Sequence, residues 1–158
     1  MKRALSLLLL ASVAAFNLNA AEEALPEPVA PLSREHLTLV HTVDAIDRDI
    51  LSMLNKQFHG VRRLANPKER YEATDQISDA SLPSRRLILA GLAPNCSFVA
   101  YEHGGRGYHL HFIVFRRDHG TWQIAYNGTG WSDGNDLDSL LKAIRNRRLR
   151  DDPRSNEF

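Results

Sequence analysis

The chain has 158 residues, enough for one ordinary domain but not for two. Hydrophobic residues make up 43% of it and charged residues 25%, which excludes wholesale disorder and collagen-like repeats. A single cysteine excludes an intrachain disulfide framework and a cysteine-rich zinc module, and a formal net charge of +1 excludes a strongly basic protein.

The first twenty residues have the order of a secretory signal peptide. Lys2 and Arg3 precede an uncharged apolar run from Ala4 to Phe16, and small or polar residues follow as far as Ala20. A membrane-spanning helix needs about 20 apolar residues, so we expect cleavage between Ala20 and Ala21 and no membrane anchor. Loss of the two basic residues leaves 18 basic and 19 acidic residues, a net charge of −1. We therefore expect a periplasmic or secreted protein without a membrane span after signal removal.

The segment 21–32 holds three prolines within six residues, which oppose both helix and strand and predict a linker. From Ser33 to Phe58, apolar residues then recur at spacings of three and four, which predicts a long N-terminal helix. They are Leu39, Val43, Ile46, Ile50 and Met53. A coiled coil has the same spacing but needs three or four heptads, whereas this stretch covers about two. A helix lying across a sheet is the favoured interpretation.

The stretch 97–126 predicts an antiparallel meander. Three runs rich in β-forming residues, 97–102, 108–116 and 121–126, are joined by a glycine-rich turn at 103–107 and a second turn at 118–120. The short apolar run 86–92 suggests a further buried strand. In the central run, His109 and His111 are two residues apart and should leave the same face of the sheet.

A second amphipathic helix is predicted near the C-terminus, because apolar residues follow the i, i+3, i+4, i+7 pattern at Leu137, Leu140, Leu141 and Ile144. Asp152-Pro153 should end it. The predicted fold is α+β: a long N-terminal helix on an antiparallel sheet of four or five strands, then the C-terminal helix. We expect one domain over 33–152 and a frayed tail over 153–158.

The glycine-rich turn is the strongest candidate for a recognition site, because aromatic, arginine and other polar residues crowd around it. These candidate binding residues are Tyr101, Glu102, His103, Arg106, Tyr108 and His109. Aromatic and arginine side chains are enriched at protein interfaces. A plain solvated hairpin is the alternative interpretation of the same residues.

A metal site is the main chemical alternative. His109 and His111 leave one strand about 7 Å apart, and Glu102 or His103 could supply a third ligand for zinc or iron. The lone Cys96 opens a strand instead of a helix, so a structural role is favoured over that of an activated nucleophile. We expect no other cofactor.

These patterns favour a small exported binding or inhibitory module with a protein partner and no catalysis of its own. A metal-dependent enzyme or metal carrier is the second hypothesis. The third is an apolar-ligand domain whose cavity, between helix and sheet, would be lined by residues such as Phe112, Val114 and Trp122. We expect no nucleic-acid partner, because the arginine run 145–150 suits the end of a helix and two aspartates follow it at once.

Overall fold

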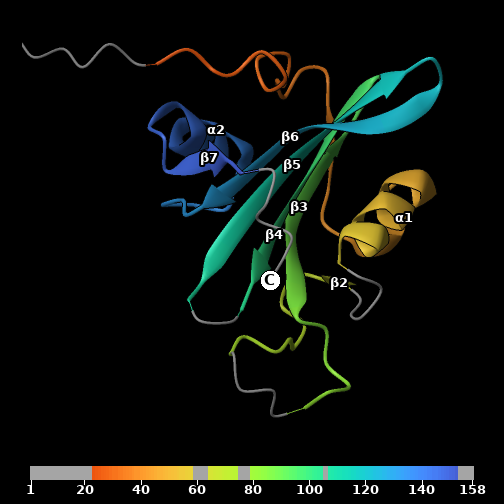
Figure 1. Ribbon diagram of the computed structural model, residues 1–158, viewed down its shortest axis with the longest axis vertical. Helices are drawn as coiled ribbons and strands as arrows, with labels where there is room; N and C mark the ends of the chain where they lie inside the picture. Colours follow the sequence, from red (N-terminus) through yellow and green to blue (C-terminus); the bar gives the residue numbers. More distant parts are fainter. Residues whose placement is uncertain (1–22, 59–63, 75–78, 105–106, 153–158) are drawn as a thin grey trace, which may run out of the picture.

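A computed structural model describes residues 23–58, 64–74, 79–104 and 107–152 of the chain (Figure 1). The predicted signal peptide 1–20, the cleavage point between Ala20 and Ala21, Arg106 and the tail 153–158 lie outside the described residues. Within the described residues, no helix combines the length and apolar character needed to cross a membrane.

A seven-stranded sheet dominates the fold, in the order β1-β3-β4-β5-β6-β7, with β2 pairing alongside β3. All pairings are antiparallel except the short parallel pairing of β2 with β3. The strands are β1 Thr38–Val40, β2 Leu64–Ala65, β3 Arg85–Leu92, β4 Cys96–His103, β5 His109–Asp118, β6 Thr121–Gly130 and β7 Leu149–Asp151.

The prediction of a long N-terminal helix on four or five strands is wrong. The structure is 38% strand and 18% helix, with two short α-helices on a larger sheet. Within 33–58 the chain forms β1, a 3-10 turn η1 at Val43–Ala45, and helix α1 at Arg48–Gln57.

The predicted long helix does not form, because Asp47, in its middle, caps the start of the shorter helix α1. The carboxylate of Asp47 accepts a hydrogen bond from the Asp49 N–H at 2.8 Å, which starts α1 there. The three-and-four spacing also joins residues that pack on opposite sides of the sheet: Leu39 contacts one core cluster, whereas Ile46 and Ile50 belong to the other. The spacing in this segment therefore reflects two different packing partners.

The predicted meander is confirmed. β4 pairs antiparallel with β5 over eight residue pairs, and β5 pairs antiparallel with β6. β3 lies on the other side of β4, as the apolar run 86–92 indicated. A shift in register between Val114 and Phe115 accommodates one extra residue in β6, and the β5–β6 hairpin closes at Asp118 and Thr121.

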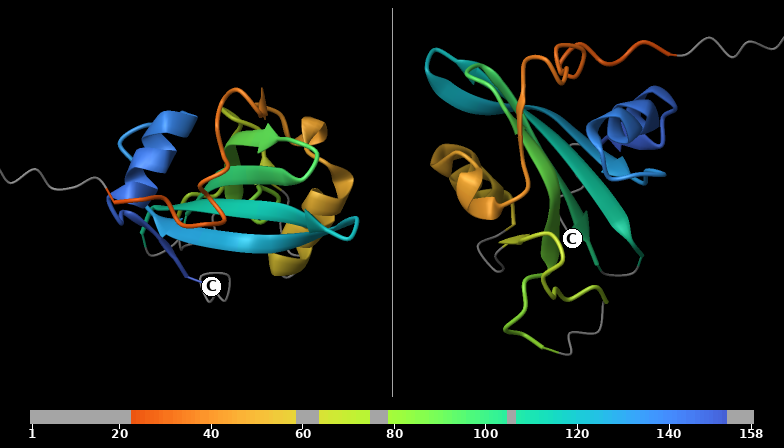
Figure 2. Two further views of the ribbon diagram at one scale, coloured as in Figure 1. Left: turned by 90° about the horizontal axis from the view of Figure 1, so that it is seen from above. Right: turned by 180° about the vertical axis from the view of Figure 1, so that it is seen from behind.

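Each face of the sheet carries its own apolar core and its own helix, and the views in Figures 1 and 2 place α1 and α2 on opposite sides of the sheet. The α1 face includes Ile46, Ile50, Leu54, Phe58, Leu87, Val99, Tyr101, Ile113, Phe115 and Trp122. The α2 face includes Val29, Leu32, Phe98, Ala100, Leu110, Phe112, Val114, Leu137, Leu140 and Ile144. Alternation along each strand sends successive side chains to these two cores, so the sheet is the central layer of three.

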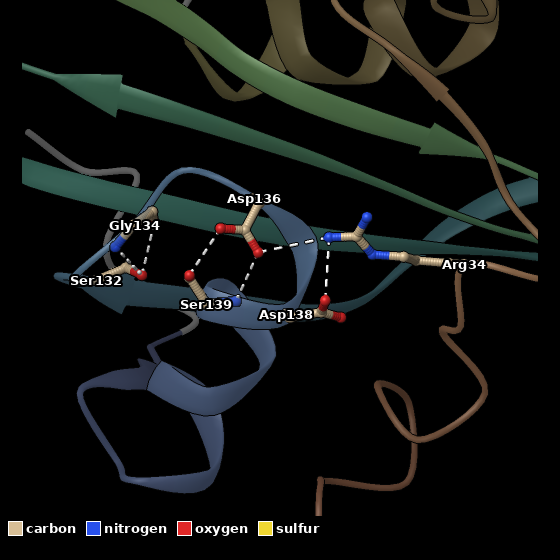
Figure 3. Close-up of polar contacts among 6 residues, drawn as sticks. All are labelled: Arg34, Ser132, Gly134, Asp136, Asp138 and Ser139. Atoms are coloured by element: carbon tan, nitrogen blue, oxygen red, sulfur yellow. Dashed lines mark hydrogen bonds and ion pairs between the residues drawn. The ribbon is translucent and has the colours of Figure 1, made fainter.

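The predicted C-terminal helix is confirmed as α2, Leu137–Arg145. Asp136 caps its start, since the Asp136 carboxylate accepts a hydrogen bond from the Ser139 N–H at 3.1 Å (Figure 3). It ends at Arg145 and not at Asp152, since Arg147 adopts a left-handed conformation (φ 55°) and the chain turns back into β7.

The described part of the proline-rich segment lies along the α2 face. Val29 and Leu32 are buried in that core. Arg34 forms ion pairs with Asp136 at 3.6 Å and Asp138 at 3.0 Å at the start of α2 (Figure 3). These contacts attach the segment to the domain, and its predicted role as a linker stays a prediction.

Candidate functional site

The β4–β5 hairpin end of the sheet holds the described candidate residues, and strand alternation divides them between the two faces. Tyr101 is registered with His111, and His103 with His109, so these four side chains share the α1 face. Glu102 is registered with Leu110 and lies on the α2 face. The residues lie at one end of the sheet, as the sequence indicated, but on its two opposite faces and therefore in two different environments.

On the α2 face, the Glu102 carboxylate is the centre of a polar and aromatic cluster. Glu102 is 9% exposed, and its Oε1 pairs with the Arg86 Nε at 2.5 Å. The Arg86 guanidinium lies 4.4 Å from the ring centroid of Tyr71. Burial and the Glu102 carboxylate raise the pKa of Tyr71, and they raise that of Tyr108 to about 12. These two hydroxyls therefore stay protonated beside the carboxylate at neutral pH.

On the α1 face, Tyr101 is a core residue. Only 1% of it is exposed, and its ring meets the edge of the Phe58 ring at the end of α1, with centroids 5.2 Å apart. Arg85 is also buried, and its guanidinium lies 4.1 Å from the Phe58 centroid. Burial raises the pKa of Tyr101 well above its ordinary value. Tyr101 thus fixes the sheet against α1 and is not available to a partner.

The histidines of the α1 face form a graded series from exposed to buried. His109 is exposed, His103 is half-buried, and His111 is 4% exposed with its ring stacked parallel to Tyr101 at 4.8 Å. Burial lowers the pKa of His103 to about 4 and that of His111 to about 3, and the Arg85 charge adds to both shifts. Both imidazoles are consequently neutral at pH 7.

The three imidazoles share a face without forming a metal site. The rings of His103 and His111 are 6.0 Å apart and meet edge to face. Among the described residues, no group of three or more His, Cys, Asp or Glu side chains could hold a metal ion. The metal hypothesis based on His103, His109 and His111 therefore finds no support in this geometry.

The sequence did not single out Trp131, a second exposed aromatic residue at the same end of the sheet. Tyr108 is 54% exposed and Trp131 is 51% exposed, and they are the large exposed apolar side chains of the described chain. Tyr108 directly precedes β5 and Trp131 directly follows β6, and Leu110 is registered with Gly130. Counting residue pairs away from the 118–121 turn would have placed residue 131 opposite the start of β5, which is the signal that could have found it.

Two smaller hypotheses can also be compared with the structure. Phe112 and Val114 lie in the α2-face core and Trp122 lies in the α1-face core, so they cannot line one apolar cavity. Cys96 opens β4 and is half-buried, and burial raises the pKa of its thiol. A raised pKa disfavours the thiolate that a nucleophile requires.

Comparison of the chain with protein-family models, with curated proteins and with solved structures found no match. Its function must therefore be inferred from the chemistry of the site itself.

Proposed function

We propose that this chain is a small exported binding or inhibitory module that docks a protein partner through the aromatic end of its sheet. The aromatic end is defined by Tyr108 and Trp131. The observation that carries the proposal is that the two large, half-exposed apolar side chains of the described residues border the same end of neighbouring strands. Single exposed apolar residues are ordinary, but two that border one end of a sheet offer a partner more apolar surface than the rest of the described chain does.

The surroundings of these aromatics support recognition by a protein. The Arg148 guanidinium lies 4.3 Å from the Trp131 centroid and pairs with Asp133 at 2.5 Å, which holds one indole face and leaves the ring in a fixed position. Tyr108 is held beside Glu102 and Arg86. Trp, Tyr and Arg are the residues that most often dominate binding energy at interfaces, and pre-positioned side chains lose little entropy on docking.

A cross-linking experiment tests the proposal. The chain, with a photoreactive amino acid replacing Tyr108, is expressed in its native host, irradiated, and the attached protein is identified and purified. The same probe at Gln123, an exposed position further back along β6, is the matched control. A specific adduct is expected at position 108 and not at position 123.

The affinity of the purified pair then gives the decisive measurement. Each interface hot spot contributes about 2 kcal/mol, or about 30-fold in affinity, so the double variant Tyr108→Ala/Trp131→Ala should weaken binding by about 1,000-fold. Its circular dichroism and melting temperature should match those of the parent chain, because both side chains are half-exposed. Equal affinity of the double variant and the Gln123→Ala variant would refute the proposed surface.

A further inference from the structure

The outer edge of β6 is open over the half of the strand that follows the 118–121 turn (Figure 1). On its inner side β6 pairs with β5 from one end to the other. On its outer side β7 pairs only with residues 128–130, and the Asp152 N–H continues that ladder with one bond to the Asn127 carbonyl. Within the described part of the chain, no strand pairs with the outer edge of 121–126. This half of β6 is therefore an unpaired sheet edge.

The open half of β6 lacks most of the features that keep sheet edges from pairing with another strand. Such edges are commonly protected by charged side chains, by proline, by a bulge or by being very short. β1 and β7 are three-residue strands, and β7 carries Arg150 and Asp151. In contrast, β6 has ten residues without a charge or a proline. Its one protective feature is the extra residue Ala125, which bends the strand there and leaves 121–124 regular.

The turn determines which backbone groups of β6 face outward. Asp118 and Thr121 close a two-residue hairpin turn, so they exchange backbone hydrogen bonds with each other. Because the backbone groups alternate along a strand, those of Gln123 face β5, whereas those of Trp122 and Ile124 face away from it. Trp122 and Ile124 therefore present outward donors and acceptors two residues apart, which is the spacing that an antiparallel partner requires.

The sequence of this edge is complementary to itself. If a second copy lies antiparallel with its Gln123 opposite Gln123, each Trp122 lies opposite the Ile124 of the other copy. In this register both Trp–Ile pairs exchange backbone hydrogen bonds, and an aromatic residue opposite a β-branched one stabilises strand pairing. The turn of the second copy then lies beside residues 126–127, where the bond to Asp152 begins. A second copy thus fills the open stretch without displacing β7.

We propose that two copies of this chain associate by pairing the open edges of β6 antiparallel about Gln123, so that their two sheets form one continuous sheet. Such an interface uses the same residues on both copies, and it closes after two, because the outer strands that stay exposed are short. The contact is small, so we expect a dissociation constant on the order of 100 µM. The open edge lies at the opposite end of β6 from Trp131, so the pairing is independent of the proposed docking surface.

An exchange of charge at Gln123 provides the test, because this exposed side chain would meet its own counterpart. Sedimentation equilibrium of the purified chain, from about 10 µM to about 1 mM, should show monomers and dimers in equilibrium. Gln123→Lys and Gln123→Glu each place like charges opposite one another, so each variant alone should associate at least tenfold more weakly. An equimolar mixture of the two variants should associate at least as tightly as the parent chain. Asn135→Lys and Asn135→Glu, at another exposed position, are the matched controls and should associate like the parent.

Amide hydrogen exchange locates the contact within the chain. The N–H groups of Trp122 and Ile124 should exchange more slowly at about 1 mM than at about 10 µM, whereas those of β1, at the other sheet edge, should not change. A photoreactive residue at position 123 should attach to a second copy of the chain, and the mass of this product distinguishes it from the adduct of the docking partner at position 108.

Three results would overturn the proposal and leave the docking surface unaffected. The first is a chain that stays monomeric up to about 1 mM. The second is a mixture of the Lys and Glu variants that associates no more tightly than either variant alone. The third is association that leaves the exchange of the Trp122 and Ile124 amides unchanged, since the contact would then lie elsewhere.

Discussion

At the hairpin end of the sheet, the two faces bury titratable groups of β4 and β5 in two different ways. Glu102, on the α2 face, is 9% exposed and remains beside the Arg86 guanidinium at 2.5 Å. His111, registered with Tyr101 on the α1 face, is 4% exposed and stays uncharged because burial, His103 and Arg85 disfavour its proton. The α2 face therefore holds an ion pair, whereas the α1 face holds a buried imidazole in its neutral form.

The difference follows from the period of two along a strand. Consecutive residues of β4 point to opposite faces of the sheet. A single hairpin can therefore hold a charged cluster on one face and an uncharged cluster on the other. The two clusters should respond differently to pH and to substitution. Acid should weaken the packing of His103 and His111 on the α1 face first, because these imidazoles are easier to protonate in the unfolded chain.

The largest expected effect is the fall in the free energy of unfolding between pH 7.5 and pH 4. The substitution His111→Phe should make this fall much smaller. The unfolded pKa of histidine is about 6.5 and the folded pKa of His111 is about 3, so the unfolded chain binds more protons between these values. Its contribution is complete above pH 6.5 and is lost as the pH falls, by about 3 kcal/mol at pH 4. Urea unfolding at pH 7.5 and at pH 4 measures this loss.

Phenylalanine preserves the stack on Tyr101 and removes both the titrating group and the unpartnered Nδ1. His111→Phe should therefore unfold with a smaller difference between pH 7.5 and pH 4 than the parent chain. Part of the remaining loss should come from half-buried His103, and part from carboxyl groups such as Asp136, whose hydrogen bonds hold their pKa values below the ordinary range. An equal acid loss in the variant and the parent would contradict the interpretation that His111 is buried as a neutral imidazole.

Glu102→Gln should have the next largest effect, on the other face. The substitution keeps the side-chain volume but leaves the Arg86 guanidinium without its carboxylate, at a cost of about 2 kcal/mol in the free energy of unfolding at pH 7. It should also lower the titration midpoint of Tyr108, because the carboxylate contributes to the raised pKa of that hydroxyl. Chemical unfolding and ultraviolet absorbance titration measure the two effects.

Glu35→Gln is the matched control, since it makes the same change of charge at an exposed position. It should leave both the unfolding free energy and the Tyr108 midpoint within error of the parent chain. If Glu102→Gln behaves like this control, the ion pair with Arg86 contributes nothing, and the comparison between the two faces is lost.

Local patterns in the sequence predicted the parts of the fold that depend on local contacts. The meander follows from β-forming runs joined by short turns, and α2 follows from a complete helical spacing with Asp136 ahead of it. The same rule failed over 33–58, where Leu39 and Ile46 satisfy one helical spacing but pack into opposite cores. β1 and β7 are three-residue strands whose pairing partners are distant in the chain, so no local sequence pattern predicts these two strands.

The sequence indicates where the candidate residues lie but not what they contact. The described residues on either side of the glycine-rich turn lie at one sheet end, because β4 and β5 pair there. Their decisive neighbours come from β3 and from the segment before it: Arg86 is 16 residues from Glu102, and Arg85 lies behind the histidines. Such pairings depend on the register of strands that the sequence alone does not fix.

The smallest expected effect lies at the other end of β5, in a turn that belongs to neither cluster. His119 and Gly120 both have positive φ, 46° and 83°, as a type I′ hairpin turn requires. Asparagine adopts this conformation more readily than histidine, so His119→Asn should raise the free energy of unfolding by about 0.5 kcal/mol. Urea unfolding of the variant and the parent chain at pH 7.5 measures this gain. An unfolding free energy no higher in His119→Asn than in the parent would contradict the idea that histidine is disfavoured at this turn position.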